Sequence, residues 1–317
     1  MVQDDTQQGR AARLSSLASS GAAPVVPPAG AHGGDGLAVA AALGLDPADL
    51  LDLSQNMNPV APPVAPLVER HADALYRYPD PAPATIELAR ALGVEAERLL
   101  LTNGGSEAIH LVTQVLGGGV RSEPEFSLHP RGTEGARWRT DPHSPTGVLA
   151  GPGETADVWD EAFYALATGL WTAGREEVTV VGSLTKTFNC PGLRIGYVLA
   201  DPEVVRGCAR RQAHWSVSTL ALAVLPDLLG TADLPTWTDA VARLRDDLVG
   251  LLRGHGLTAT AADAPWVLVR EPRLRERLAP HGVLVRDCRS FGLPGTFRIA
   301  VPGPPGFERL EAALARL

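Results

Sequence analysis

The segment RLLLTNGG, residues 98–105, reads as a β-strand that ends in a glycine turn, and the residues after it, SEAIHLVTQVLGG, have helical periodicity. Strand, glycine turn and helix in this order begin a βαβ unit. Buried strands are also predicted in ADVWDEAFY and EVTVVGSLT, and RIGYVLADPEVV predicts a strand that leads through Asp-Pro into a helix. Strands that alternate with helices predict an α/β domain with a mostly parallel sheet.

A second domain is predicted from the change of pattern near the C-terminus. After a helix-rich stretch from about Trp215 to His255, short strands are expected in WVLVRE, GVLVRD and TFRIAV, separated by helices. They predict a smaller α+β domain, which the segment after His32 would complete. The expected division is a disordered leader (1–30), an N-terminal arm that contributes to the small domain (31–72), a large domain (73–230) and a small C-terminal domain (231–317).

Composition excludes several classes of function. The net charge of -8 lacks the basic footprint of a nucleic-acid-binding protein. No apolar run approaches the roughly 20 residues that span a bilayer, so no membrane partner is expected. Cys190, Cys208 and Cys288 are too few and too scattered for a disulfide framework or a metal site. A reduced cytoplasmic location is therefore the expectation.

Lys186 is the only lysine in a chain with 28 lysines and arginines. A guanidinium stays protonated, whereas an amine that is desolvated or close to other cations loses its proton and attacks carbonyl carbons. Drift in composition explains why lysine is rare here. It does not explain why the one lysine lies in the polar segment SLTKTFNCPGLRIGY after an apolar run, and this position favours a catalytic amine.

Two further features predict partners for that amine. The glycine turn before Ser106 offers free backbone N–H groups at a helix N-terminus, where an anion is favoured, although a plain turn capped by Ser106 is the alternative. Ser183 and Arg194 could add donors to the same phosphate. Asp160 ends a predicted buried strand, where an unpaired carboxylate is costly, and a protonated pyridine nitrogen or a salt bridge would satisfy it.

Together these motifs resemble fold-type I pyridoxal-phosphate enzymes of the aminotransferase class. The resemblance extends over most of the chain from His32 on, and it is strongest to the L-threonine-O-3-phosphate decarboxylases of cobalamin biosynthesis, then to histidinol-phosphate aminotransferases. The segments that carry it are HGGD, LLDLSQNMNP, YRYPDP, HSPTG, DEAF, SLTKTFNCPGLRIGY, RRQAHWSVSTLALAVL and VLVRDCRSFGLPGTFRIAV.

The resemblance implies pyridoxal 5'-phosphate as cofactor and assigns roles to residues. Lys186 would bind the cofactor and act as acid and base at the substrate's α carbon, and Asp160 would pair with the pyridinium nitrogen. The remaining assignments are the cofactor phosphate (Gly105, Ser106, Ser183, Arg194, and Tyr78 from a second subunit), the cofactor ring (Phe126 by stacking, Ser144 at the 3-oxygen), the substrate carboxylate (Arg298) and the substrate phosphate (His32, Asn56, Arg286). A homodimer that acts on a phosphorylated amino acid is implied.

The sequence departs from the family in three places. Ser144 replaces the asparagine of the usual Asn-Pro-Thr-Gly turn, and Phe163 replaces the tyrosine that is common in transaminases. Only 12 residues separate Gly147 from Asp160, too few for the usual helix and strand, and the stretch from Gly117 to Asp141 is likewise shorter than in the family, so part of this region should be loop. The preferred function is decarboxylation of L-threonine O-3-phosphate. The alternatives are transamination of the histidinol-phosphate type and a non-catalytic protein of the same pathway.

Overall fold

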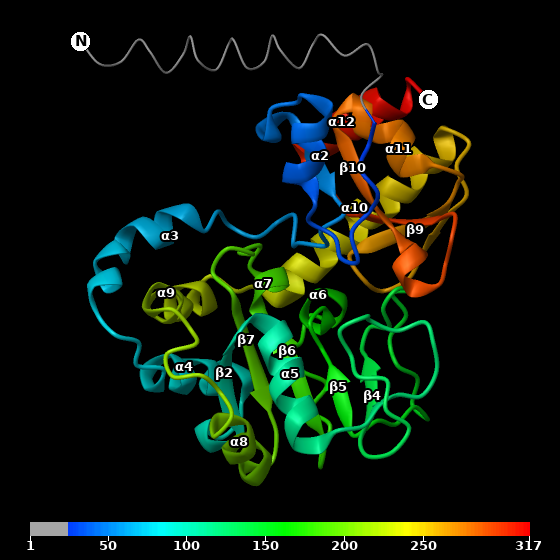
Figure 1. Cartoon of the computed structure of the whole chain (residues 1–317). Coiled ribbons are helices and arrows are strands. Elements are labelled where there is room, and N and C mark those ends of the chain that lie inside the picture. Colours follow the sequence, from blue (N-terminus) through cyan, green and yellow to red (C-terminus); the bar gives the residue numbers. More distant parts are fainter. Residues whose placement is uncertain (1–24) are drawn as a thin grey trace, which may run out of the picture.

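The computed structural model describes residues 25–317, which form two sheets with helices around them (Figure 1). Six strands make the larger sheet and five make the smaller one. The predicted leader lies outside the described residues except for 25–30. None of the helices within 25–317 combines the length and apolarity needed to cross a membrane. The predicted α/β class with a mostly parallel sheet is confirmed.

The larger sheet has the strand order β2-β7-β6-β5-β4-β3. From β3 to β6 neighbouring strands run parallel, whereas β7 runs antiparallel to both β2 and β6. The strands predicted in the sequence around Leu100, Trp159, Val181 and Tyr197 are present. The bounds are β2 (Leu99–Asn103), β3 (Gly119–Val120), β4 (Arg137–Thr140), β5 (Val158–Asp160), β6 (Thr179–Ser183) and β7 (Ile195–Leu199).

Alternating side chains on the strands divide between the two faces of this sheet, as a period of two requires. In β7, Tyr197 packs into a core with helices α4 and α9, and Val198 packs on the opposite face with α5 and α8. Figure 1 shows α5 lying across the strands. The bounds are α3 (Ala65–Arg70), α4 (Ala82–Leu92), α5 (Gly104–Leu116), α6 (Tyr164–Thr168), α7 (Leu184–Thr187), α8 (Pro202–Ala209) and α9 (Thr219–Gly230).

The region that the sequence marks as too short is loop. Neither the connection 121–136 between β3 and β4 nor the connection 141–157 between β4 and β5 contains a helix. Parallel strands need a crossover of about a dozen residues, and these connections provide that length without a helix. The expectation of loop between Gly147 and Asp160 is therefore confirmed.

The smaller sheet has the order β1-β10-β11-β9-β8. The segment after His32 supplies β1, which pairs in parallel with β10, and the other pairs are antiparallel. Helix α10 begins in the core of the larger sheet with Trp237 and ends in that of the smaller sheet with Leu252. The bounds are α2 (Gly36–Leu43), β1 (Leu51–Leu53), α10 (Leu234–Gly254), β8 (Ala259–Ala261), β9 (Trp266–Arg270), α11 (Leu274–Leu278), β10 (Val283–Asp287), β11 (Thr296–Ala300) and α12 (Pro304–Leu314).

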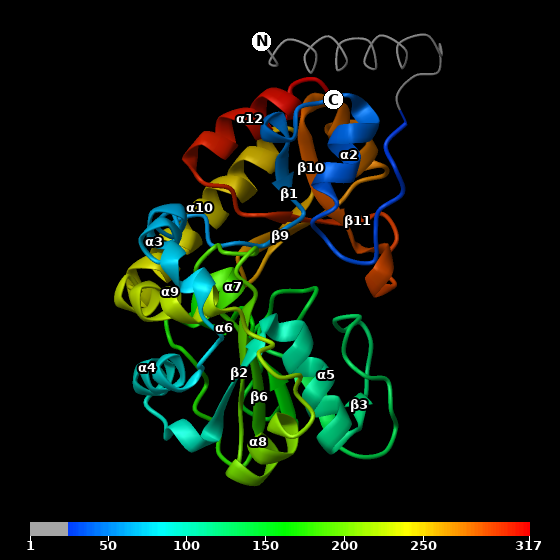
Figure 2. The ribbon, with the colours of Figure 1, turned by 60° about the vertical axis from the view of Figure 1, so that its left-hand side comes forward.

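The two sheets lie at opposite ends of the molecule, and the first described residues run along the end that holds the smaller sheet (Figure 2). Arginine side chains hold this start, because Arg275 donates to the carbonyl of Pro27 at 2.6 Å and Arg286 donates to that of Gly30 at 3.3 Å. His32 is thereby brought toward the carboxyl ends of the large-sheet strands. The predicted division into four segments remains a prediction.

Candidate active site

A cavity of about 400 Å³ lies between the two sheets. The large sheet contributes the residues that follow β4, β5 and β6 and the first turn of α5, and the small sheet contributes β10 and β11. Side chains at the carboxyl ends of parallel strands meet at one edge, which explains this convergence. All but one of the predicted site residues line the cavity: His32, Asn56, Gly105, Ser106, Phe126, Ser144, Asp160, Ser183, Lys186, Arg194, Arg286 and Arg298.

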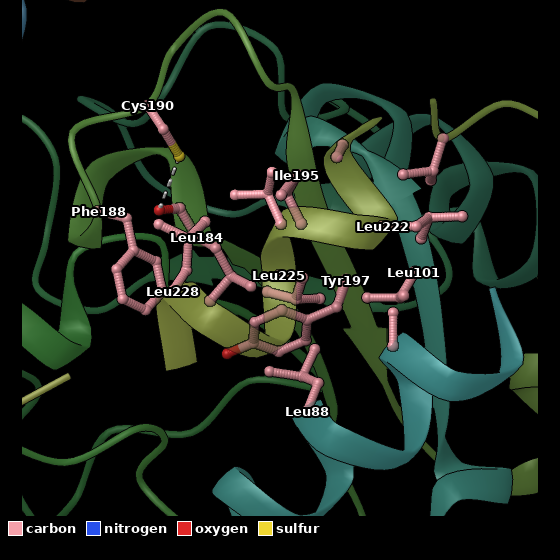
Figure 3. Packing of buried hydrophobic residues seen from close by; sticks show 14 of the residues in the cluster. Leu88, Leu101, Leu184, Phe188, Cys190, Ile195, Tyr197, Leu222, Leu225 and Leu228 are labelled. Atoms are coloured by element: carbon pink, nitrogen blue, oxygen red, sulfur yellow. Dashed lines mark hydrogen bonds between the residues drawn. The ribbon is translucent and has the colours of Figure 1, made fainter. Parts of the chain in front are cut away.

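Lys186 lies in the single turn α7 that follows β6. Leu184 and Phe188, on either side of it, are buried in the core with α9 and fix that turn (Figure 3). Burial, together with the nearby cations Arg298 and Arg194, lowers the pKa of the Lys186 amine to about 8. An amine with this pKa is partly unprotonated near neutral pH, as a nucleophile or a general base must be.

The glycine turn and Arg194 form one cradle beside Lys186. Gly104 has a φ of 75°, and a Cβ there would overlap the guanidinium of Arg194. Its neighbour in space, Gly196 of β7, likewise has no room for a Cβ beside the backbone of Gly104. No side chain caps the N-terminus of α5, so its first N–H groups are available to a ligand. This combination of donors suits a phosphate.

Asp160 lies at the end of β5 and is held from two directions. Its Oδ1 accepts from the backbone N–H of Ala162 at 3.0 Å, and its Oδ2 lies 2.9 Å from Nε2 of His129. A carboxylate accepts, so Nε2 of His129 carries the proton of this bond. Asp160 therefore has a buried partner, yet it still faces the cavity, where it could pair with a cation.

Arg298 is buried in β11 and is surrounded by polar groups. With its amide oxygen facing the guanidinium, Asn56 accepts from Nε and Nη2 of Arg298, both at 3.0 Å. Ser144 accepts from Nη1 at 3.3 Å, and the ring centroid of Trp266 lies 4.7 Å from the guanidinium carbon. The structure thus places Asn56 beside Arg298, whereas its predicted role was with Arg286 at the substrate phosphate.

Arg286 lies directly opposite Arg298, because these two residues pair in the β10–β11 ladder. Its Nη2 donates to Oγ of Ser290 at 2.8 Å, whereas its buried Nε has no hydrogen-bond partner within residues 25–317. Burial and the nearby charge of Arg286 lower the pKa of His32, whose ring lies 5.8 Å from that of Phe126. His32, Phe126 and Arg286 thus form one side of the cavity.

Tyr78 is the predicted site residue that does not line the cavity. Its side chain is 78% exposed and packs at 4.7 Å against the ring of Trp215. The prediction places Tyr78 in the site of a second subunit, and its exposure on one chain is compatible with that role. The assignment of all these residues to functions remains a prediction that their placement supports.

Several buried polar residues at or behind the cavity were not among the predicted ones, and three of them are connected to one another or to Asp160. His129 contacts Asp160, Glu125 is 3% exposed, and Thr140 donates to Glu125 at 2.7 Å. His129 and Glu125 flank Phe126 in the segment PEFSLHP, where the sequence analysis selected the aromatic residue alone. The available signal was the presence of polar residues on both sides of Phe126, the aromatic residue predicted to stack on the cofactor ring.

Comparison with known proteins agrees with this geometry. The sequence model of the family "Aminotransferase class I and II" matches residues 138–317. The chain is 31% identical to the threonine-phosphate decarboxylase of Salmonella typhimurium, over 90% of this chain and 95% of that protein. It is 27% identical to the histidinol-phosphate aminotransferase of Natronomonas pharaonis, over 82% of this chain and 89% of that protein.

Among solved structures, the histidinol-phosphate aminotransferase of Sinorhizobium meliloti in complex with pyridoxal-5'-phosphate has a TM-score of 0.70. It is 19% identical in sequence, and the match covers 82% of this chain and 88% of that one. This likeness shows the same fold. With the family match, it confirms the predicted cofactor, pyridoxal 5'-phosphate.

The cavity also fits this cofactor chemically. The cradle of Gly104 and Arg194 would fill with a phosphate, and the buried hydroxyl of Thr185 in the same wall has no hydrogen-bond partner. Asp160 offers a carboxylate to a ring nitrogen, and Lys186 offers an amine to an aldehyde carbon. A phosphate, a basic ring nitrogen and an aldehyde are the three groups that pyridoxal 5'-phosphate presents.

Proposed function

We propose, since the chain belongs to the aminotransferase class I and II family, that this pyridoxal-phosphate-dependent enzyme decarboxylates L-threonine O-3-phosphate to (R)-1-aminopropan-2-yl phosphate. This product would serve the assembly of the nucleotide loop of cobalamin. The 31% identity to a threonine-phosphate decarboxylase over nearly the whole chain supports the proposal. The geometry of the cavity supports it independently.

The observation that carries the proposal is that two neighbouring guanidinium groups line one cavity. Arg286 and Arg298 are partners in the β10–β11 ladder, so their side chains lie on the same face of the sheet, and both are buried and line the cavity. Burying two like charges side by side is costly unless anions compensate them. L-Threonine O-3-phosphate carries two anionic groups, a carboxylate and a phosphate, whereas histidinol phosphate has no carboxylate.

In the proposed mechanism the protein binds, orients and moves protons. Arg298 would hold the carboxylate through a bidentate pair, and Arg286 with His32 would hold the phosphate. When bound, pyridoxal 5'-phosphate supplies an electron sink for the charge left at the substrate's α carbon. Lys186 would return a proton to that carbon, since its pKa of about 8 suits both proton states near neutral pH.

Asp160 and Arg194 would fix the cofactor at its two ends. The carboxylate of Asp160 would favour a proton on the ring nitrogen, and Arg194 would neutralise the phosphate together with the first turn of α5. The orientation of the substrate's anions then decides which bond at the α carbon breaks. We propose that a second copy of this chain completes the site with Tyr78, which is exposed here.

An aminotransferase of the histidinol-phosphate type is the second candidate. The observation that favours it is the 27% identity to such an enzyme over most of both chains. The same lysine, aspartate and phosphate cradle would serve either reaction. Phe163 distinguishes them, because its ring lies 5.9 Å from the Lys186 amine and carries no hydroxyl where transaminases commonly have a tyrosine.

The deciding experiment supplies the cofactor-loaded protein with L-threonine O-3-phosphate and measures carbon dioxide and the amine product. We expect stoichiometric release of both, and no release from a Lys186→Ala control. A keto acid formed without gas in the presence of an amino acceptor would instead establish the aminotransferase. Cofactor binding without turnover of either substrate class would establish the non-catalytic alternative.

A matched pair of variants tests the two-anion argument. Arg298→Lys keeps a charge but loses the planar fork, and Arg286→Lys does the same on the neighbouring strand. Each should raise KM for L-threonine O-3-phosphate by about tenfold to a hundredfold, which is the loss of one charge-assisted pair. If neither variant changes KM, the paired guanidiniums do not bind the substrate.

A further inference from the structure

A buried chain of hydrogen bonds lies behind the cavity, at the end of β4 and in the loops on either side of this strand. The backbone N–H of Ser144 donates to Oγ1 of Thr140 at 2.8 Å, and that hydroxyl donates to Oε2 of Glu125 at 2.7 Å. Thr140 also donates its backbone N–H to Oε1 of Glu125 at 3.3 Å. The chain of donors therefore ends on a carboxylate.

His129 lies between this carboxylate and that of Asp160. Its Nε2 lies 2.9 Å from Oδ2 of Asp160, and its Nδ1 lies 3.9 Å from Oε2 of Glu125. The side chain of His129 is fully buried, and Nδ1 has no hydrogen-bond partner among the residues that the structure describes. The imidazole of His129 couples the two carboxyl groups electrostatically, because it lies close to each of them and water is excluded from the space between.

The backbone of Glu125 bonds to the side chains of Glu123 and Arg131, and its own side chain has few further partners within residues 25–317. Besides Thr140 and His129, the titratable group that faces it is His143, whose Nε2 lies 3.9 Å from Oε1. That nitrogen is 2.8 Å from the carbonyl of Pro124, to which it donates. Packing around His129 is aromatic, with the rings of Phe126 and Trp138 each at 5.6 Å. Asp160 is therefore the functional group that Glu125 reaches through His129.

We propose that Glu125 is a positioning residue for the cofactor. Its carboxyl group acts through His129 on Asp160, and so sets how strongly Asp160 favours a proton on the cofactor's ring nitrogen. This inference rests on the role proposed above for Asp160 and does not depend on which substrate is turned over. Burial raises the pKa of Glu125, whereas the hydrogen bonds from Thr140 and the nearby His143 and His129 act in the opposite direction and favour the carboxylate.

The test compares Glu125→Gln with Glu125→Asp and Glu123→Gln. Gln keeps the shape and removes the charge, and Asp keeps the charge. Glu123→Gln is the control two residues away: the side chain is 57% exposed, and its Oε2 accepts from the backbone N–H of Glu125 at 2.8 Å, a bond that the amide oxygen of Gln can still accept. The first readout is the pH midpoint of the absorbance change of the lysine-bound cofactor. Removing a negative charge behind Asp160 should lower this midpoint by roughly 0.5–1 unit.

Glu125→Asp should retain most of the wild-type midpoint, and Glu123→Gln should match the wild type. An unchanged midpoint in a folded, cofactor-loaded Glu125→Gln would overturn the proposal. This readout needs bound cofactor only, so its failure is distinct from a failure of the decarboxylation assay. Should Glu125→Gln not fold, Thr140→Val removes a hydrogen bond that favours the charged carboxylate of Glu125, and it should lower the same midpoint by a smaller amount.

A second readout uses the protein without cofactor. In protein labelled with ¹⁵N-histidine, the ring-nitrogen signals of His129, assigned with a His129→Asn variant, should move in Glu125→Gln and stay in place in Glu123→Gln. Unmoved signals would show that Glu125 does not act through His129. If Glu125 had only a structural role, both Glu125→Gln and Glu125→Asp would change stability, and the size of the spectral shifts would not follow the charge at position 125.

Discussion

The two halves of the large sheet are built in different ways. Around β2, β7 and β6, helices cover both faces and apolar residues such as Leu225 and Val198 fill the space between them. Around β3, β4 and β5, loops replace the crossover helices, and buried carboxyl groups pair with polar partners. The first half carries Lys186 and the phosphate cradle, and the second carries Ser144, Phe126 and Asp160.

This difference shows how a shortened chain can keep its site. Helix packing is a non-directional source of stability, and the half with the cofactor attachment retains it. Polar contacts are directional, and in the other half Arg175 pairs with both Asp141 and Glu161 while stacking 3.9 Å from the ring of Trp159. The looped half is thus expected to depend on charge pairing, and the helical half on burial.

Replacing Arg175 with Met should have the largest effect on stability in the looped half. The change leaves the buried carboxyl groups of Asp141 and Glu161 without their cation, at a cost of about 3 kcal/mol in the free energy of unfolding at neutral pH. Burial already raises the pKa of Glu161, so acid should neutralise the unpaired groups and reduce this loss. Urea unfolding at several pH values measures it.

Leu225→Ala is the matched change in the helical half. Leu225 is fully buried in α9 (Figure 3), and its truncation should cost a similar amount, about 3 kcal/mol, with no dependence on pH. If both variants responded to pH in the same way, the contrast between a charge-paired and an apolar half would fail.

Lys186→Met sharpens the comparison by removing the one buried amine from the helical half. The pKa of Lys186 is about 8 in the folded chain and near 10.5 when unfolded, so the unfolded state binds more protons between these values. Folding with a charged Lys186 is therefore penalised below pH 8, and the penalty fades as pH rises to 10.5. The cofactor-free variant should be more stable than the wild type by about 2–3 kcal/mol at pH 7.

The same urea experiments check this prediction. The gap between Lys186→Met and the wild type should narrow steadily above pH 8 and be small at pH 10.5. A gap that stayed constant over this interval would mean that the amine is not held in a desolvated site, and the proposed nucleophile would lose its physical basis.

Ser144→Ala should have the smallest effect. The hydroxyl accepts one long hydrogen bond from Arg298, at 3.3 Å, and Asn56 holds two other nitrogens of the same guanidinium. Its loss should raise KM for L-threonine O-3-phosphate about threefold, which corresponds to less than 1 kcal/mol. A much larger effect on kcat would give Ser144 a role at the cofactor itself.

Much of the fold could be predicted from the sequence because its signals are local. The strand and glycine turn before Ser106 predicted β2 and α5, and the short spacing before Asp160 predicted the loop between β4 and β5. The antiparallel direction of β7 was not predicted, since a buried apolar run carries no mark of strand direction. Lys186 and Arg194 could be placed in one site because they share a single segment.

The roles of Glu125 and His129 could not be predicted, because they depend on contacts between residues that are distant in the sequence. Glu125 and His129 matter through contacts with Thr140 and Asp160, and such pairings over 15 and 31 residues depend on how the strands align. Asn56 was assigned to the substrate phosphate, but tertiary packing places it on Arg298. Sequence spacing cannot distinguish two arginines that lie opposite each other in one ladder.

The central claim is that Lys186 holds pyridoxal 5'-phosphate in the cavity between the two sheets, and reductive trapping tests it most directly. The chain has one lysine, so treating the cofactor-loaded protein with borohydride and mapping the adduct by mass spectrometry leaves only Lys186 and the terminal amine as candidates. We predict one adduct per chain on Lys186 and none in Lys186→Ala. An adduct confined to the terminal amine, or no adduct at all, would contradict the account.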